Sequence, residues 1–169
     1  MLALKKPIEN CYWVVPGKIL AGEYPRNLEE SSSRKKIKRL LNAGVELFID
    51  LTEHDEGLSP YEDMLCGSAS HRRHPIKDVS VPESPKTTLT ILNEIDEANR
   101  DGKLIYIHCW GGIGRTGLIV GCWLARHGHL GKEALSHLRM LWQNCPKSAF
   151  RKSPETSEQE SYILAWKEE

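Results

Sequence analysis

One short segment of the chain carries side chains that could bind an anion and attack it. His108 and Cys109 end an apolar run, three glycines follow, and Arg115 and Thr116 begin an apolar segment of helical character. A cysteine in this position could be an inert core thiol, a metal ligand or a nucleophile facing an anion. The residues around Cys109 decide between these three interpretations.

The three glycines, Gly111, Gly112 and Gly114, lie between a predicted strand and a predicted helix. In such a turn, backbone N–H groups and the N-terminus of the helix together attract an anion. Glycine adopts positive φ easily and has no Cβ to obstruct the concavity, so we expect these positions to wall an anion site. A Walker loop would end in Gly-Lys-Ser/Thr, whereas Gly114 precedes Arg115, which disfavours nucleotide binding.

The polar side chains of the loop suit a nucleophile better than a core residue. A thiol beside N–H donors, a helix N-terminus and a guanidinium is favoured as the thiolate. Arg115 has a planar fork that can hold two phosphate oxygens. Thr116 can hydrogen-bond the sulfur, and His108 is placed to order the loop by hydrogen bonding. Cys122, inside an apolar helix, is predicted to be an inert core thiol.

Length and composition narrow the class of protein. The chain has 169 residues, and we expect residues 1–169 to form a single domain. Lys plus Arg equals Asp plus Glu, at 23 each, which argues against a nucleic-acid partner. Neither a secretory signal nor an apolar run of about 18 residues is evident, so we expect no membrane partner. The five cysteines are widely spaced and contain no CxxC pair, which predicts free thiols, a cytoplasmic location and no metal site. We also expect the protein to be a monomer.

The elements that must position these side chains alternate along the sequence. We predict strands at 12–15, 18–23, 45–51, 71–76 and 103–108, and helices within 27–44 and at 85–100, 115–128, 134–142 and 157–166. Residues 52–70 are predicted to be a loop with one short helix. Ser157 and Glu160 fit a capping box for the last helix. The alternation predicts an α/β fold, with a central, mostly parallel sheet of four to five strands flanked by helices.

The loop also resembles a known signature. Residues 108–117 read HCWGGIGRTG, similar to the signature of the cysteine-based protein tyrosine phosphatase superfamily, in which His-Cys is followed by five residues and then Arg-Ser/Thr. The segments ILAGEYPR and VELFIDLTE resemble the first strand and a later strand and loop of small dual-specificity phosphatases. The resemblance implies a phosphatase of that fold, without cofactor or metal. It implies that Cys109 is the nucleophile and that the phosphate is bound by Arg115 and the loop residues Trp110, Gly111, Gly112, Ile113 and Gly114.

Cleavage of a phosphate ester also needs a proton for the leaving oxygen, usually from a carboxylic acid. Members of the superfamily carry an aspartate on a mobile loop upstream of the cysteine. The segment HPIKDVSVPES resembles that loop and makes Asp78 the candidate for the acid of the first step and the base of the second. A solvated loop aspartate is the competing interpretation, and Asp50, Asp55 and Glu83 are weaker candidates.

Two further features have both a functional and a structural interpretation. Gln159 resembles the glutamine with which some family members position the hydrolytic water, but a surface glutamine fits equally well. The basic segment 71–74 could form a rim for phosphorylated substrates, or it could be a strand with solvated basic ends.

The substrate predicted from this resemblance is a phosphorylated protein. We predict hydrolysis of phosphotyrosine, with phosphoserine and phosphothreonine as further substrates, through a phosphocysteine intermediate. Trp110 and Ile113 stand where phosphoinositide-type members carry lysines, which disfavours a lipid substrate. The alternatives are a phosphoinositide phosphatase or RNA 5′-phosphatase of the same fold, and a non-enzymatic phosphoprotein-binding module. A rhodanese-type sulfurtransferase also uses a loop cysteine but does not require this arginine and an upstream acid.

Overall fold

A computed structural model describes residues 3–169 and contains one five-stranded sheet with the strand order β1-β2-β5-β3-β4. The strands are β1 (Cys11–Val15), β2 (Ile19–Gly22), β3 (Val45–Asp50), β4 (Ser70–Arg73) and β5 (Leu104–His108). Only β1 and β2 are antiparallel; the other neighbouring strands are parallel. The predicted α/β fold with a mostly parallel sheet is therefore confirmed.

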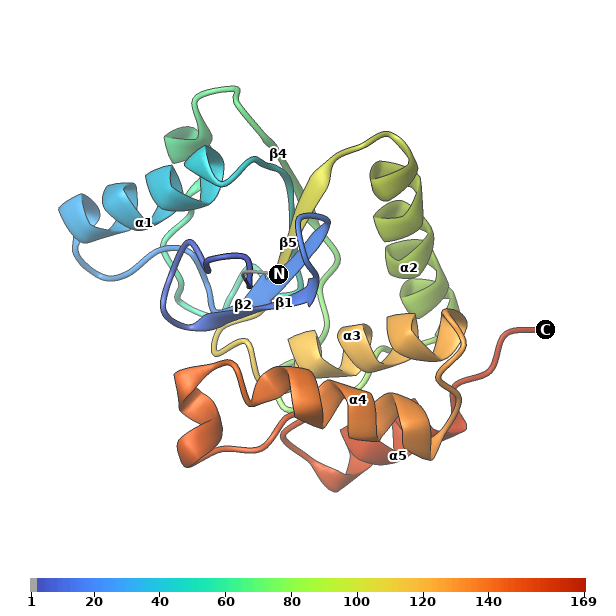
Figure 1. Ribbon diagram of the computed structural model, residues 1–169. Helices are drawn as coiled ribbons and strands as arrows, with labels where there is room; N and C mark the ends of the chain where they lie inside the picture. Colours follow the sequence, from blue (N-terminus) through green and yellow to red (C-terminus); the bar gives the residue numbers. More distant parts are fainter. Residues whose placement is uncertain (1–2) are drawn as a thin grey trace.

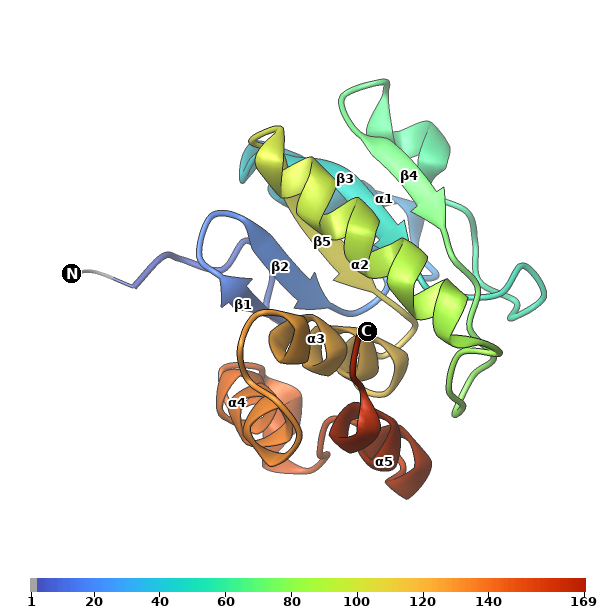
Figure 2. The same cartoon turned by 90° about the vertical axis from the view of Figure 1, so that its right-hand side faces the viewer.

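Helices cover both faces of the sheet (Figures 1 and 2). One face carries α1 (Glu30–Asn42) and the short 3₁₀ helix η1 (Glu62–Leu65). The other face carries α2 (Pro85–Arg100) and α3 (Arg115–Arg126), and α4 (Lys132–Trp142) and α5 (Ser157–Ala165) pack against α3. A second 3₁₀ helix, η2 (Pro146–Ala149), lies between α4 and α5 in the chain.

The central strand β5 explains why both faces are covered. All five of its residues are buried, and successive side chains of a strand point to opposite faces. Tyr106 belongs to the apolar cluster beneath α1, whereas Ile105 and Ile107 belong to the cluster beneath α2 and α3. The strand thus holds its C-terminal residue, His108, rigidly between two cores.

The capping box predicted for the last helix is wrong by one residue. Thr156, not Ser157, is the N-cap, and its hydroxyl accepts a hydrogen bond from the Gln159 backbone N–H at 3.1 Å. The Gln159 side chain, not that of Glu160, accepts from the Thr156 N–H at 3.1 Å. Both pairs satisfy the same sequence rule, so the pattern alone fits two registers. In the observed register, the Gln159 side chain helps to cap the N-terminus of α5.

The end of one strand also differs from the prediction. The strand predicted at 71–76 ends at Arg73, and only two isolated backbone bonds, from His74 to Asp50 and from Ile76 to Leu51, continue beyond it. Because β3 itself ends at Asp50, the chain after β4 leaves the sheet and becomes the loop that contains Asp78.

Within residues 3–169, no helix has the length and apolar character needed to cross a membrane.

Candidate active site

The glycine loop connects the end of β5 to the first residue of α3, at the C-terminal edge of the parallel strands. Cys109 and Arg115 are 3% and 1% exposed, so both belong to the interior. They face a cavity of about 220 Å³ that also reaches a loop preceding α2. The cavity is lined by Asp78, Val79, Cys109, Trp110, Gly111, Ile113, Gly114, Arg115, Arg151 and Glu155. Side chains that lie far apart in the sequence therefore share one small space.

Four carbonyl groups of the loop are held by donors from outside it. The bonds are His108 Nδ1 to Cys109 O (3.1 Å), Tyr24 N to Trp110 O (2.8 Å), Lys147 Nζ to Gly111 O (2.8 Å) and Ser153 Oγ to Ile113 O (2.6 Å). In a trans peptide the C=O and the following N–H point in opposite directions. The N–H after each of these carbonyls therefore points away from the donor and toward the inside of the loop, which makes the loop an anion cradle.

Two of the three loop glycines, Gly112 and Gly114, are needed for different reasons. Gly112 has φ +73°, and a Cβ there would lie 2.4 Å from the backbone carbonyl carbon of Gly22. Gly111 and Gly114 do not have positive φ. A Cβ on Gly114 would lie 2.9 Å from Gln159 Nε2, so close packing, not backbone conformation, favours glycine at that position.

The guanidinium of Arg115 is bound by two carboxylates. Glu56 accepts from both ends of the fork, with 3.0 Å between Glu56 Oε2 and Arg115 Nη2, and Asp78 Oδ1 lies 3.0 Å from the same Nη2. Arg115 Nη1 also donates to the Ile76 carbonyl at 3.0 Å. Burial by itself lowers the pKa of Arg115, but the hydrogen bonds that it donates to Glu56 and its interaction with nearby Cys109 raise the pKa overall. The buried arginine therefore stays charged.

Glu56 is a site residue that sequence reasoning missed. It lies in the loop after β3, beside Glu53 and Asp55, and no spacing rule distinguishes one acidic residue of such a loop from its neighbours. Only the fold shows that Glu56 turns inward, where its Oε1 also accepts the Glu53 N–H at 2.7 Å. The contact fixes the orientation of the Arg115 fork.

Asp78 lies at the mouth of the cavity, and its side chain is 47% exposed. Its Oδ1 also accepts the backbone N–H of Val79 at 2.9 Å. Val79 has φ +58°, a conformation that β-branched residues rarely adopt and that is found mostly at functional sites. The weaker candidates Asp55 and Glu83 are exposed and do not line the cavity.

Asp50 is fully buried at the end of β3, where its Oδ1 lies 4.0 Å from His108 Nδ1. Its Oδ1 accepts from the Thr52 N–H at 2.9 Å, and its Oδ2 contacts His71 Nε2 at 2.9 Å and Arg73 Nη2 at 3.2 Å. Burial opposes ionisation, but the bond to His71 and the other contacts hold the pKa of Asp50 well below its usual range. A carboxylate that remains ionised cannot donate a proton, so Asp50 is not the acid.

The basic segment 71–74 does not form a rim around the cavity. His71 and Arg73 bind Asp50, while Arg72 and His74 pair with Glu94 of α2. None of the four lines the cavity. The segment is therefore not a rim, and it is not a solvated strand end either: apart from Arg72, its side chains are mostly buried and paired with Asp50 or Glu94.

His108 has no exposed surface, and both of its ring nitrogens are occupied. Nδ1 lies 3.1 Å from the Cys109 carbonyl, to which it donates, and Nε2 accepts from the Tyr61 hydroxyl at 2.6 Å. Burial lowers the pKa of His108 to about 4, so the ring is neutral near pH 7. A neutral ring with one donor and one acceptor fits both contacts.

This burial predicts a pH dependence of stability. In the unfolded chain the histidine pKa is about 6.5, so on acidification the unfolded state takes up the proton first. The free energy of unfolding should therefore fall between pH 6.5 and pH 4, by about 3 kcal/mol from this residue. Urea unfolding of the wild type and of His108→Gln across this range measures the difference. The variant should show the shallower slope, and equal slopes would contradict a neutral buried His108.

Thr116 and Gln159 differ in part from their predicted contacts. The hydroxyl of Thr116 is buried and has no hydrogen-bond partner among residues 3–169, so the expected bond to the Cys109 sulfur is not formed in this structure. Gln159 is buried, not a surface residue. Its Oε1 accepts from the Glu155 and Thr156 N–H groups, and its Nε2 donates to the Ser80 carbonyl at 3.0 Å. It thus connects α5 to the loop of Asp78.

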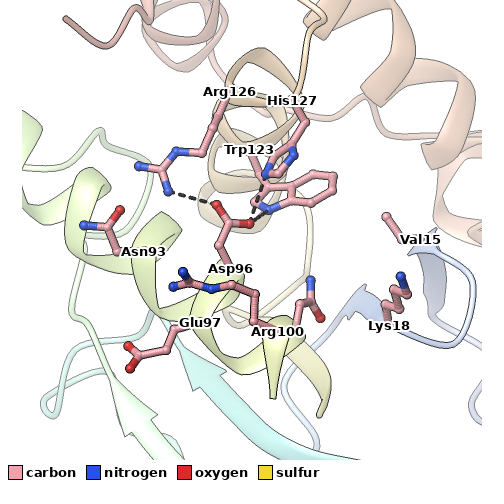
Figure 3. Close-up of a pocket in the computed structure, with 10 residues that line it drawn as sticks. Val15, Lys18, Asn93, Asp96, Glu97, Arg100, Trp123, Arg126 and His127 are labelled. Atoms are coloured by element: carbon pink, nitrogen blue, oxygen red, sulfur yellow. Dashed lines mark hydrogen bonds and ion pairs between the residues drawn. The ribbon is translucent and has the colours of Figure 1, made fainter. Parts of the chain in front are cut away.

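A larger cavity, of about 990 Å³, lies elsewhere, between α2, the end of α3 and the turn between β1 and β2 (Figure 3). Asp96 is its central polar group and is already satisfied. It accepts from Trp123 Nε1 and His127 Nε2, both at 2.9 Å, and from Arg126 Nη1 at 3.0 Å. No residue predicted to be functional lines this cavity, so the smaller one at the glycine loop is the candidate site.

Comparison with known sequences identifies a family that most of the chain matches. Residues 8–163 match the model of a family described as Swiss Army Knife protein, DSP-PTPase phosphatase domain. A protein named "Putative tyrosine phosphatase 067L", from Invertebrate iridescent virus 3, is 33% identical over 115 residues, which are 66% of this chain and 44% of that protein. Phosphatidylglycerophosphate phosphatase PTPMT2 of Arabidopsis thaliana is 30% identical over 109 residues, 64% of this chain and 48% of that protein. The chain thus spans less than half the length of these relatives.

Comparison with solved structures supports the fold. The active form of Tk-PTP superposes with a TM-score of 0.73 at 24% identity, covering 91% of this chain and 93% of that one. Kinase associated phosphatase, carrying a serine in place of its catalytic cysteine, gives a TM-score of 0.73 at 18% identity, covering 91% and 90%. At these identities the likeness establishes the architecture alone.

Proposed function

The chain belongs to the family of Swiss Army Knife DSP-PTPase phosphatase domains, and from this premise we propose that it hydrolyses phosphotyrosine in proteins through a phosphocysteine intermediate. Phosphoserine and phosphothreonine are proposed as further substrates. One observation carries the proposal: Cys109, Arg115 and Asp78 line a single cavity whose backbone is arranged as an anion cradle.

In the first step, Cys109 Sγ attacks phosphorus in line with the leaving oxygen. The bond between phosphorus and that oxygen breaks, and Asp78 gives its proton to the oxygen. The loop N–H groups and Arg115 hold the three equatorial oxygens, whose charge they stabilise most strongly in the transition state. The position of Asp78 at the cavity mouth supports this role, because the leaving group must exit there.

In the second step, water attacks the phosphocysteine while Asp78 takes a proton from it. The sulfur–phosphorus bond breaks, and orthophosphate and the Cys109 thiolate are released. We propose that the Thr116 hydroxyl turns toward the departing sulfur, a role supported by its burial without another partner among the described residues. We also propose that Gln159 helps to place the water through the amide N–H that is not bound to Ser80.

Substrate binding must rearrange the contact between Arg115 and Asp78. Both the phosphate and Asp78 require Arg115 Nη2, since the carboxylate lies 3.0 Å from that nitrogen. A phosphate dianion competes better for the fork because two of its oxygens bind at once. We expect it to release Asp78, which can then take up a proton and turn toward the leaving oxygen.

A substrate panel tests the proposal directly. Turnover is measured on phosphotyrosine, phosphoserine and phosphothreonine peptides, a phosphoinositide, phosphatidylglycerophosphate and an RNA 5′-triphosphate. The highest kcat/KM is expected for phosphotyrosine peptides, with inhibition by vanadate and no requirement for metal. A higher kcat/KM on a lipid or on RNA would replace the proposed substrate class, and binding without turnover would indicate a phosphoprotein-binding module.

Lipid hydrolysis is the second candidate because one relative is named as a phosphatidylglycerophosphate phosphatase. The side chains at the cavity favour the protein substrate. Trp110 is 61% exposed beside the catalytic thiol and offers an aromatic surface, whereas highly charged head groups would be better served by a lysine at this position.

Replacing Asp78 by asparagine should slow turnover in proportion to how much the leaving group needs a proton. For a poor leaving group such as a phenolate of high pKa, we expect kcat to fall on the order of 10²-fold or more. For an activated aryl phosphate the loss should be much smaller, because its leaving oxygen departs without a proton. Steady-state kcat on a series of aryl phosphates gives the dependence.

Asp55→Asn is the matched control, since Asp55 is an exposed loop aspartate that does not line the cavity. It should leave both rates unchanged. An equal loss on good and poor leaving groups in Asp78→Asn would assign the acid to another residue.

The remaining proposals concern the domain organisation, the oligomeric state and the location of the protein. We propose that residues 1–169 form one catalytic domain, that it acts as a monomer on phosphorylated proteins, and that it works in the cytoplasm. All five cysteines are free thiols, which supports a reducing compartment. Sedimentation equilibrium, limited proteolysis and cell fractionation test the three points. A stable dimer, a protease-resistant fragment shorter than the sheet and helices, or recovery with membranes would contradict them.

A further inference from the structure

Lys147 contacts the glycine loop from a segment for which the sequence predicted no functional residue. It lies in η2, and its side chain is 19% exposed. Its Nζ donates to the Gly111 carbonyl at 2.8 Å and lies 2.9 Å from Glu23 Oε2. Lys147 does not line the cavity, so it acts on the loop from behind.

Glu23 holds the lysine in this position. Its other carboxylate oxygen binds Lys36 at 2.6 Å, and its own backbone carbonyl accepts the hydroxyl of Tyr106. Burial opposes ionisation, but hydrogen bonds from Lys36 and Lys147 lower the pKa of Glu23 below its ordinary value. The ammonium of Lys147 is therefore fixed between a carboxylate and the loop.

The peptide between Gly111 and Gly112 needs such an outside contact. Neither residue has a Cβ, so the backbone at this point has more accessible conformations than elsewhere in the loop. If the peptide turned over, the Gly111 carbonyl would face the cavity and repel a phosphate, and the Gly112 N–H would be lost as a donor. Of the four carbonyls held from outside, only this one is held by a charged side chain.

We propose that Lys147, clamped by Glu23, is a positioning residue that keeps the Gly112 N–H directed at the bound phosphate. The inference rests on the proposed function, because it takes the loop to be the phosphate site. Lys147 touches neither substrate nor sulfur; it acts through the Gly111–Gly112 peptide. It therefore affects oxyanion binding and transition-state stabilisation together.

The test compares Lys147→Met with Lys152→Met. Lys152 lies five residues further along the same segment, is 63% exposed, pairs with Glu160 and does not line the cavity. For Lys147→Met we expect kcat/KM on an aryl phosphate to fall about 10²-fold, the loss typical of one oxyanion donor, and the inhibition constant of vanadate to rise similarly. Lys152→Met should match the wild type in both, and Lys147→Arg should recover most of the loss because it restores a charged donor.

Three results would overturn the proposal: unchanged vanadate affinity in Lys147→Met, an equal loss in Lys152→Met, or no recovery in Lys147→Arg. Should Lys147→Met fail to fold, Glu23→Gln provides a second test. We expect it to lower kcat/KM and to weaken vanadate inhibition, each by less than Lys147→Met. Vanadate binding and the shift of the Gly112 amide resonance on adding orthophosphate need no turnover. If the wild type binds oxyanions but hydrolyses none of the substrates, the proposed function is wrong. The role of Lys147 in oxyanion binding is then still tested by the vanadate and orthophosphate measurements.

Discussion

Replacing Cys109 by serine is expected to abolish hydrolysis, with kcat on an aryl phosphate falling on the order of 10⁴-fold or more. Serine has nearly the same size as cysteine, so the buried position should accept it and the fold should persist. A hydroxyl, however, is a weak nucleophile without an adjacent base. His108 cannot serve as that base, because its Nδ1 faces the Cys109 carbonyl and its Nε2 is bound by Tyr61. The loss is therefore chemical, not structural.

Cys66→Ser is the matched control for this variant. Cys66 is an exposed free thiol in the segment after η1, away from the cavity. It should show wild-type kcat/KM and a wild-type midpoint of thermal unfolding. Cys109→Ser should also unfold at the wild-type midpoint and still bind vanadate. Turnover in Cys109→Ser above a few per cent of the wild-type rate would end the assignment of Cys109 as the nucleophile.

Replacing Arg115 by lysine is expected to reduce kcat/KM on the order of 10³-fold, although the charge is kept. Lysine presents one ammonium, whereas the guanidinium can hold two phosphate oxygens with parallel bonds. The ammonium also cannot reproduce the two-ended contact with Glu56, so the cation loses its fixed orientation. Steady-state kinetics with an aryl phosphate and titration with vanadate measure the effect.

Arg126→Lys is the matched control on the same helix. Arg126 likewise pairs with two carboxylates, Asp96 and Glu168, but lies at the other end of α3. That variant should lose some stability and little activity. If Arg115→Lys lost no more activity than Arg126→Lys, the role of Arg115 in holding phosphate would be wrong.

The fold could be predicted because its central elements carry strong one-dimensional patterns. The short run before His108 is apolar at every position, which is typical of a strand covered on both faces. The segment after Arg115 is apolar nearly all round, which is typical of a buried helix. The capping box was misplaced because two registers satisfied the same rule. Thr156 with Gln159 and Ser157 with Glu160 fit one capping pattern equally well, and only packing selects between them.

The candidate site was predictable where the chemistry is contiguous in sequence. Cys109, the glycines and Arg115 stand within one loop, and the resemblance of residues 74–84 to the acid loop of the superfamily made Asp78 the candidate acid. Glu56 and Lys147 were not predictable, because each reaches the loop from a distant segment and bears an ordinary surface residue type. Sequence spacing describes neighbours along the chain, whereas these contacts exist only after the sheet has brought the segments together.

The defining step of the proposed mechanism is transfer of the phosphoryl group to the sulfur of Cys109. The direct measurement is rapid acid quenching of Asp78→Asn during turnover of an activated aryl phosphate, followed by mass spectrometry of the peptide that contains Cys109. In this variant the first step proceeds without the acid while the second lacks its base, so the intermediate should accumulate. We expect one phosphoryl group on Cys109 and none in Asp78→Asn that also carries Cys109→Ser. Burst release of the phenol with no phosphoryl group on Cys109, or with the group on another residue, would contradict the mechanism.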